Sequence, residues 1–365
     1  MASPGILSTD LQTRLAERTL QLIDIASESG AERNIADHVL GLLRDGGVPA
    51  RDAGDLCVLA GATSRSDRPF VLLAGHLDTV PGQDNWPGRR TSEHVQGLGA
   101  SDMKGGVAVM LELALAGASG RVDCGSVDVG YVLFGREELP AADGALGPLL
   151  AREPGLRSAD LAIMLEPTAN AVQAGCLGNL DATWTFHGRA GHSARPWLAD
   201  NAVDRAAAAV QALHAIGPSR RTIDGLDFTQ VVSVTTLHAG VARNVIPGTA
   251  TANVNFRYAP DMTAEQAERT LRDWCEPHGE VDVLGNSPGA LPPHENPLLD
   301  RLLVASEGSF EAKQAWTPVA ELAAAGVEAI NFGPGDPSFA HRPDERVATD
   351  ALARCYRVLE SFLCA

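Results

Sequence analysis

Short, almost purely apolar runs recur in the first half of the chain and again near its end. Each has about the length of a strand and gives way to polar residues; the runs are Phe70–Gly75, Val127–Gly135, Leu161–Leu165 and Ala329–Gly333. Stretches with helical character separate them, for example Lys104–Ala118. Strands that are buried on both faces and alternate with helices are typical of a mostly parallel sheet. We therefore predict an α/β fold for these parts of the chain.

The middle of the chain follows a different pattern. Four strands with alternating or apolar character and two helices are expected there; in chain order they are Asp181–Phe186, helix Asn201–Ile216, Val231–Leu237, Thr249–Tyr258, helix Ala264–Trp274 and Glu280–Leu284. The order β-α-β-β-α-β is that of a small ferredoxin-like α+β domain. We expect this domain at residues 176–289, inserted into a discontinuous domain made of residues 1–175 and 290–365.

Length and charge narrow the functional classes. A chain of 365 residues exceeds what one hydrophobic core usually covers, which agrees with two domains. The formal net charge of −17 disfavours nucleic acid and anionic membranes as partners, because both reward clustered basic residues. No apolar run approaches the ~20 residues of a membrane span, and no signal-peptide pattern opens the chain. We therefore expect a cytoplasmic protein.

Six cysteines are scattered along the chain without a C-x-x-C pair: Cys57, Cys124, Cys176, Cys275, Cys355 and Cys364. In a chain without a signal peptide, this spacing indicates reduced thiols rather than a disulfide framework. We expect all six to be small, buried apolar residues.

Imidazole and carboxylate side chains gather at the ends of the predicted strands. His76, Glu138 and Glu166 follow three of the apolar runs, His341 lies in the loop after the fourth, and Asp102 lies in a glycine-bounded turn that opens a helix. Ligands bind outside the carboxyl ends of the strands in open α/β sheets. Two histidines and three carboxylates can hold two divalent ions if one carboxylate bridges them. This donor mixture suits zinc, with cobalt or manganese as substitutes.

Two short motifs add to this set. In His76-Leu77-Asp78, residues two apart in an extended segment point the same way, so Asp78 can accept the second ring N–H of His76 and fix its tautomer. Glu137 and Glu138 are adjacent and would point apart in extended chain, so that one can bind a metal while the other faces the attacking water. Taken alone, each motif favours a solvated surface pair over a metal site. Their joint occurrence at strand ends favours a metal site.

The same residues lie in longer motifs that resemble a known family, the dinuclear zinc amidohydrolases and exopeptidases. This family includes succinyl-diaminopimelate desuccinylase, acetylornithine deacetylase, aminoacylase and carboxypeptidase G, and the resemblance runs nearly end to end. The motifs that carry it are Gly75–Pro81, Gly99–Gly106, Glu137-Glu138, Leu165–Thr168, Gly191–Pro196, Asn244–Pro247 and the late His341.

The resemblance implies roles for the residues at the strand ends. The expected ligands of two zinc ions are His76 and Glu166 on one side, Glu138 and His341 on the other, and Asp102 as the bridge. Glu137 is expected to be the general acid/base of an amide hydrolysis, and Asp78 is expected to orient His76.

The inserted domain is similar to the lid and dimerisation domain of the family. This implies a homodimer in which His192 acts at the site of the neighbouring subunit and stabilises the tetrahedral intermediate. Arg257 and Asn244 match positions that the family uses around the substrate. The guanidinium fork of Arg257 suits a substrate carboxylate, with Arg195 and Arg189 as the next candidates.

The expected substrate follows from local likeness within the family. The stretches Gly175–Leu180 and Asn331–Pro337 are most similar to desuccinylases of actinobacteria-like organisms, which implies removal of succinate from N-succinyl-L,L-diaminopimelate in lysine and diaminopimelate biosynthesis. Two departures affect substrate recognition: no arginine lies near positions 176–179, and Thr317-Pro318 stands where many members have Thr-Asp. Acetylornithine deacetylation, aminoacylase activity and dipeptide cleavage remain alternatives. A catalytically silent metal-binding paralogue is the alternative from another class, and Glu137 argues against it.

Overall fold

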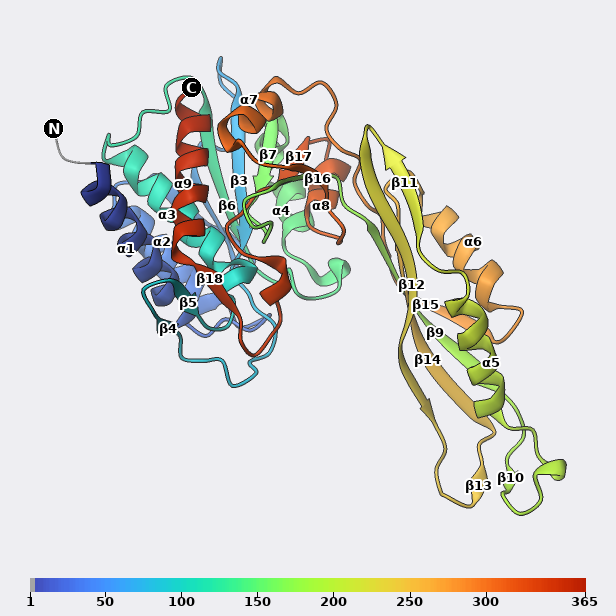
Figure 1. Cartoon of the computed structure of the whole chain (residues 1–365). Helices are drawn as coiled ribbons and strands as arrows, with labels where there is room; N and C mark the ends of the chain where they lie inside the picture. The colour runs from blue at the N-terminus through green and yellow to red at the C-terminus, as the bar shows by residue number, and fades with distance from the viewer. Residues whose placement is uncertain (1–3) are drawn as a thin grey trace. The chain divides into compact units, whose positions relative to one another are not determined.

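The structure is a computed structural model that describes the backbone of residues 4–365 and the side chains from residue 10 onwards. The described chain divides into two compact units (Figure 1). The first comprises the residues up to Ala174 with Pro292–Glu311 and Thr317–Ala365, and the second comprises Gly175–Leu291 with Ala312–Trp316. Among the described helices, none combines the length and the apolar content needed to cross a membrane.

The first unit contains an eight-stranded mixed sheet with the order β1-β2-β6-β3-β7-β17-β8-β16. Its strands are Ala50–Gly54 (β1), Cys57–Gly61 (β2), Phe70–His76 (β3), Asp128–Phe134 (β6), Leu161–Met164 (β7), Val172–Ala174 (β8), Phe310–Ala312 (β16) and Ala329–Asn331 (β17). The four apolar runs of the sequence form the centre, where β6, β3, β7 and β17 are parallel. Antiparallel pairs flank them. The α/β prediction is confirmed, with the parallel part confined to the central strands.

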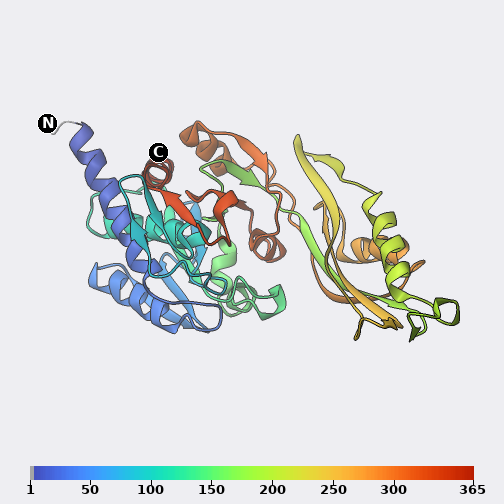
Figure 2. The same cartoon turned by 60° about the horizontal axis from the view of Figure 1, so that its bottom comes forward.

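Helices pack around this sheet and against one another (Figures 1 and 2). They are Pro4–Ile23 (α1), Arg33–Asp45 (α2), Gly105–Ala118 (α3), Leu146–Arg152 (α4), Pro297–Ser306 (α7), Val319–Ala324 (α8) and Thr349–Cys364 (α9). Helix α3 is buried along most of its length, and its single charged residue is Glu112. Nε and Nη2 of Arg18 in α1 lie 3.2 and 3.1 Å from Oε1 of Glu112, so the buried carboxylate is paired.

The second unit is an antiparallel five-stranded sheet with two helices on one face. The strand order is β11-β12-β14-β9-β15, and the elements are Gly178–His187 (β9), Ala202–His214 (α5), Ser219–Ile223 (β11), Leu226–Ala239 (β12), Thr249–Tyr258 (β14), Ala264–Cys275 (α6) and Glu280–Ser287 (β15). The predicted β-α-β-β-α-β order is present, with β11 as an additional strand that forms a hairpin with β12.

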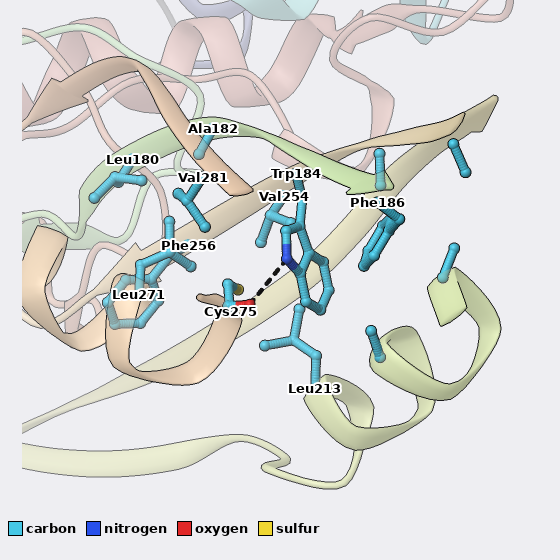
Figure 3. Packing of buried hydrophobic residues seen from close by; sticks show 14 of the residues in the cluster. Leu180, Ala182, Trp184, Phe186, Leu213, Val254, Phe256, Leu271, Cys275 and Val281 are labelled. Atoms are coloured by element: carbon cyan, nitrogen blue, oxygen red, sulfur yellow. Dashed lines mark hydrogen bonds between the residues drawn. The ribbon is translucent and has the colours of Figure 1, made fainter. Parts of the chain in front are cut away.

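The core of this unit lies between the sheet and its helices (Figure 3). Trp184 on β9 packs with Leu213 from α5 and Leu271 from α6, and each such side chain contributes about 1.5–3 kcal/mol when fully buried. The indole N–H of Trp184 donates to the carbonyl oxygen of Cys275 at 3.0 Å, so its polar atom is satisfied. Alternate residues of β9 and β14 are buried in this core, which leaves the other residues of each strand on the opposite, polar face.

The prediction that all six cysteines are buried is wrong for two of them. Cys57, Cys176, Cys275 and Cys355 are buried, whereas Cys124 is partly exposed and Cys364 is exposed. Cys124 lies in the loop before β6 and Cys364 is the last residue of α9, with the two sulfur atoms 3.9 Å apart. A loop and the end of a helix both leave the neighbouring packing incomplete.

Candidate metal centre

The five candidate ligands come from the ends of neighbouring elements in the first unit. His76 is the last residue of β3, Glu138 follows β6 and Glu166 follows β7. Because these strands are parallel, their carboxyl ends lie at one edge of the sheet. Asp102 comes from the turn Ala100–Lys104 (η1) before α3, and His341 comes from the loop between β17 and the strand Arg346–Ala348 (β18). The structure brings all five together.

Asp102 lies between the two histidines. Its Oδ1 is 3.1 Å from Nε2 of His76, and its Oδ2 is 3.3 Å from Nε2 of His341. Oε1 of Glu166 is 3.9 Å from the same nitrogen of His76, and Oε1 of Glu138 is 2.9 Å from that of His341. The ligand atoms thus form two groups, each within 4.8 Å, that share Asp102: His76, Asp102 and Glu166, and Asp102, Glu138 and His341. A carboxylate with one oxygen toward each group can bridge two cations.

The carboxylates change the proton affinity of both imidazoles. Burial lowers the pKa of His76, but hydrogen bonds to Asp102 and Asp78 outweigh it, and the pKa lies well above its usual value. Hydrogen bonds to Asp102 and Glu138 raise the pKa of His341 to about 10. Burial opposes ionisation of Asp102, yet its contacts with the two histidines lower its pKa. The site therefore attracts positive charge on both sides of Asp102, and this donor set fits zinc and similar divalent ions.

Asp78 contacts the site differently from the sequence prediction. The acceptor nearest to Nδ1 of His76 is the backbone carbonyl oxygen of Asp78 at 3.0 Å, while the carboxylate Oδ1 is 3.5 Å away. The carboxylate has three other donors: the backbone N–H groups of Glu137 and Glu138, each at 3.0 Å, and the hydroxyl of Ser29 at 2.7 Å. Asp78 therefore fixes the position of the Glu137-Glu138 turn as well as that of His76.

Glu137 and Glu138 lie in a turn rather than in the extended segment expected from the sequence. Arg136 before them has φ of 59°, and its N–H donates to Oε1 of the buried Glu32 at 2.9 Å. The turn lets both glutamates reach the site, where each has a carboxylate oxygen in one group with His76. Burial and the nearby Glu166 raise the pKa of Glu137 well above its usual value.

Two further contacts around the site were not predicted. Glu345, 2% exposed, accepts backbone N–H groups from the turn that carries Asp102. Burial raises the pKa of Glu345 to about 7, although its N–H donors favour the ionised form. Gln83 donates from Nε2 to the carbonyl oxygen of His341 at 3.0 Å. These residues act on the backbone, and no spacing or residue type in the sequence indicates such contacts.

His192 and Asn244 lie side by side in the second unit. The strand Gly191–His192 (β10) pairs with Val245–Ile246 (β13), and the N–H of Ser193 donates to the carbonyl oxygen of Asn244 at 3.0 Å. The N–H of Ala194 donates to Nδ1 of the exposed His192 at 3.0 Å. In the neutral ring the proton is therefore on Nε2, which can donate to a substrate oxygen.

Arg257 lies on β14 of the five-stranded sheet, at the end far from the two-stranded sheet β10-β13. It is opposite Asn179 near the start of β9, whereas Thr249 is opposite His187, close to β10. Arg257 lies eight positions after Thr249 along β14, which corresponds to about 27 Å at 3.4 Å per residue. One copy of this unit cannot place Arg257 and His192 on the same small substrate.

Comparisons with known proteins agree with a metal-dependent hydrolase that carries an inserted second domain. The model of the family described as "Peptidase dimerisation domain" matches residues 176–283. A protein of Mycobacterium tuberculosis described as a putative succinyl-diaminopimelate desuccinylase is 38% identical over 357 residues, which cover 97% of this chain and 99% of the relative. The succinyl-diaminopimelate desuccinylase of Corynebacterium glutamicum is 36% identical over 94% of this chain and 95% of its own.

A solved structure shows the same fold. The YXEP protein of Bacillus subtilis, described as a dinuclear metal binding peptidase from the M20 family, superposes with a TM-score of 0.68 at 16% identity, over 97% of this chain and 98% of that one.

Proposed function

Because the chain belongs to the M20 family of metal-dependent amide hydrolases, which contains the succinyl-diaminopimelate desuccinylases, we propose that it hydrolyses N-succinyl-L,L-diaminopimelate to succinate and L,L-diaminopimelate. The observation that carries this proposal is the nearly full-length match to relatives of that name. The two ligand groups that share Asp102 support the metal-dependent chemistry.

The proposed cofactor is a pair of divalent cations, zinc in the first place, with cobalt or manganese as substitutes. His76 and Glu166 would bind one ion, Glu138 and His341 the other, and Asp102 would bridge them. When bound, such ions polarise the amide carbonyl and lower the pKa of the attacking water.

The chain's own residues then move the protons and hold the substrate. Glu137 takes a proton from the attacking water and delivers it to the departing amine. The carboxylate of Asp78 accepts the backbone N–H of Glu137 and so keeps Glu137 in position. Nε2–H of His192, contributed by the partner subunit in our proposal, donates to the oxygen that becomes negative in the tetrahedral intermediate.

A panel of substrates tests the proposed activity. Zinc-loaded protein is expected to show its highest kcat/KM on N-succinyl-L,L-diaminopimelate, compared with N-acetylornithine, other N-acyl amino acids and dipeptides. A higher kcat/KM on N-acetylornithine would show that the substrate is wrong, while the proposed amide hydrolysis would stand. Metal binding without turnover of any compound would favour the silent paralogue.

Substitution of single ligands should distinguish a bridging residue from a terminal one. Asp102→Ala is expected to abolish tight binding of both ions, because both share this carboxylate, whereas His341→Ala should leave about one ion per chain. The measurement is zinc content after dialysis against a weak chelator. Equal and independent effects of the two substitutions on a single bound ion would indicate a mononuclear centre.

Arg257 lies on the polar face of the five-stranded sheet, opposite the core, and we propose that it binds a substrate carboxylate. Its Nε donates to Oδ1 of Asn255 at 3.0 Å, and Asn255 in turn donates to Asn179 at 2.7 Å, so the guanidinium is held by neighbouring strands. Arg257→Ala is expected to raise KM about 10- to 100-fold, since a hydrogen bond to a charged group contributes about 1.5–3 kcal/mol.

The matched control is Arg221→Ala, because Arg221 belongs to the same unit and forms an exposed ion pair with Asp261 at 2.7 Å. KM should stay close to the wild-type value in this variant. If Arg257→Ala leaves KM unchanged, the carboxylate lies elsewhere, and Arg189 and Arg195 become the next residues to substitute.

The second unit also supports the proposal of a homodimer. β11 pairs with Leu226–Gln230 of β12, whereas in the described chain Val231–Ala239 pairs on one side only, with β14. Leu237 on this strand and Val203 on α5 are large exposed apolar residues. An open strand edge beside apolar surface favours pairing with a second copy.

A further inference from the structure

A buried carboxylate outside the proposed ligand set contacts the loop that carries Asp102. Oε1 of Glu345 accepts the N–H groups of Ser101 and Asp102, both at 3.0 Å, and Oε2 accepts the N–H of Gly99 at 2.9 Å. Three converging N–H donors are a strong arrangement for a buried carboxylate, because hydrogen bonds to an ionised acceptor are about twice as strong as neutral ones.

Glu345 also belongs to the loop that carries His341, four positions earlier in the sequence. Its carbonyl oxygen accepts the N–H of Gly97 at 3.0 Å, and β18 begins directly after it and pairs with the strand His94–Gln96 (β5). The segment before Asp102 and the segment after His341 are therefore joined at Glu345. Asp102 and His341, two of the three proposed ligands of one metal ion, therefore depend on the same junction.

We propose that Glu345 is a positioning residue for the metal centre, which holds Asp102 and His341 at the spacing that two bridged cations require. This inference rests on the proposed function, since it presupposes the metal centre. Glu345 acts through the backbone of the turn Gly99–Asp102 and does not bind metal.

The effect of removing the Glu345 carboxylate follows from the backbone N–H groups that lose their acceptor. Glu345→Ala leaves three N–H groups without their acceptor, so η1 can shift to find other partners. In metalloproteins, loss of a residue that orients a ligand typically weakens metal affinity 10- to 100-fold. Glu345→Gln retains one oxygen for Ser101 and Asp102 but presents an N–H₂ group toward Gly99, so a smaller loss is expected.

The test is a metal titration of metal-free protein with Zn²⁺ or Co²⁺ against a chromophoric chelator, at a temperature where circular dichroism shows every variant to be folded. Wild-type protein is expected to bind two ions. Glu345→Ala should weaken both binding steps 10- to 100-fold and alter the visible absorption of the Co²⁺ form, with Glu345→Gln in between.

Glu321→Gln is the matched control. Glu321 is a partly buried carboxylate on α8 that accepts the backbone N–H of Gly147, away from η1. Its substitution should leave metal affinity and the Co²⁺ spectrum unchanged, even if it lowers the melting temperature.

The possible results distinguish a failure of the role of Glu345 from a failure of the proposed metal-dependent function. Wild-type affinity in both Glu345 variants would overturn the role of Glu345 alone, while wild-type protein that binds no divalent ion would overturn the proposed function together with it. If Glu345→Ala does not fold, Glu345→Gln decides: metal affinity and a Co²⁺ spectrum equal to those of Glu321→Gln would contradict the inference.

Discussion

Glu137→Gln is expected to lower kcat about 100- to 10,000-fold while the metal content stays near that of the wild type. The Glu137 carboxylate is outside both ligand groups that share Asp102, so its loss removes a proton acceptor and no bridging contact. Glutamine preserves the size of the side chain, and the N–H of residue 137 can still donate to Asp78. The measurements are steady-state kinetics and zinc content of the same preparation.

Glu138→Gln is the control for this prediction. Glu138 lies beside His341 in one of the two ligand groups, so its substitution should reduce the metal content as well as turnover. If instead Glu137→Gln loses metal and Glu138→Gln retains it, the roles of the two glutamates are exchanged.

Mixing two inactive variants is expected to restore about a quarter of wild-type activity. The variants are His192→Ala and Glu137→Ala, combined under conditions that exchange subunits. If His192 acts across the dimer, each mixed dimer has one site with both residues intact. Random pairing makes half of the dimers mixed, so roughly one site in four is active.

The structural reason for this expectation is the length of the second unit. His192 lies on β10, beyond the end of the five-stranded sheet that is far from Arg257, so one substrate can contact both residues only if they come from different subunits. Each variant taken alone through the same exchange is the control and should remain inactive. Mixing that restores no activity would mean that His192 acts within its own chain or has no catalytic role.

The buried elements of the fold were predictable from the sequence because burial leaves a clear pattern. β3 and β7 are fully buried strands and appear as apolar runs that end at polar residues. β11 was missed because its sequence, Ser-Arg-Arg-Thr-Ile, is almost entirely exposed and becomes a strand only by pairing with β12. The available signal was Asp224-Gly225, whose φ values of 49° and 79° suit a tight hairpin turn.

The candidate ligands were predictable because metal binding requires particular side chains. Glu345 and the turn contacts of Asp78 were not, since these carboxylates bind backbone N–H groups, which every residue type except proline carries. The contact between Glu345 and Ser101 joins residues 244 positions apart. Similarly, the proximity of Cys124 and Cys364 depends on where α9 ends, which no local pattern reveals.

The position of β17 in the sheet has a consequence for synthesis of the chain. β17 lies between β7 and β8, although the second unit lies between β8 and β17 in the sequence. Until Ala329–Asn331 has left the ribosome, β7 and β8 both keep an unpaired edge, and the carboxylates near Glu138 lack His341. Such late, long-range pairing folds slowly and exposes strand edges to aggregation. The central sheet is therefore expected to be completed only after about nine-tenths of the chain has been synthesised.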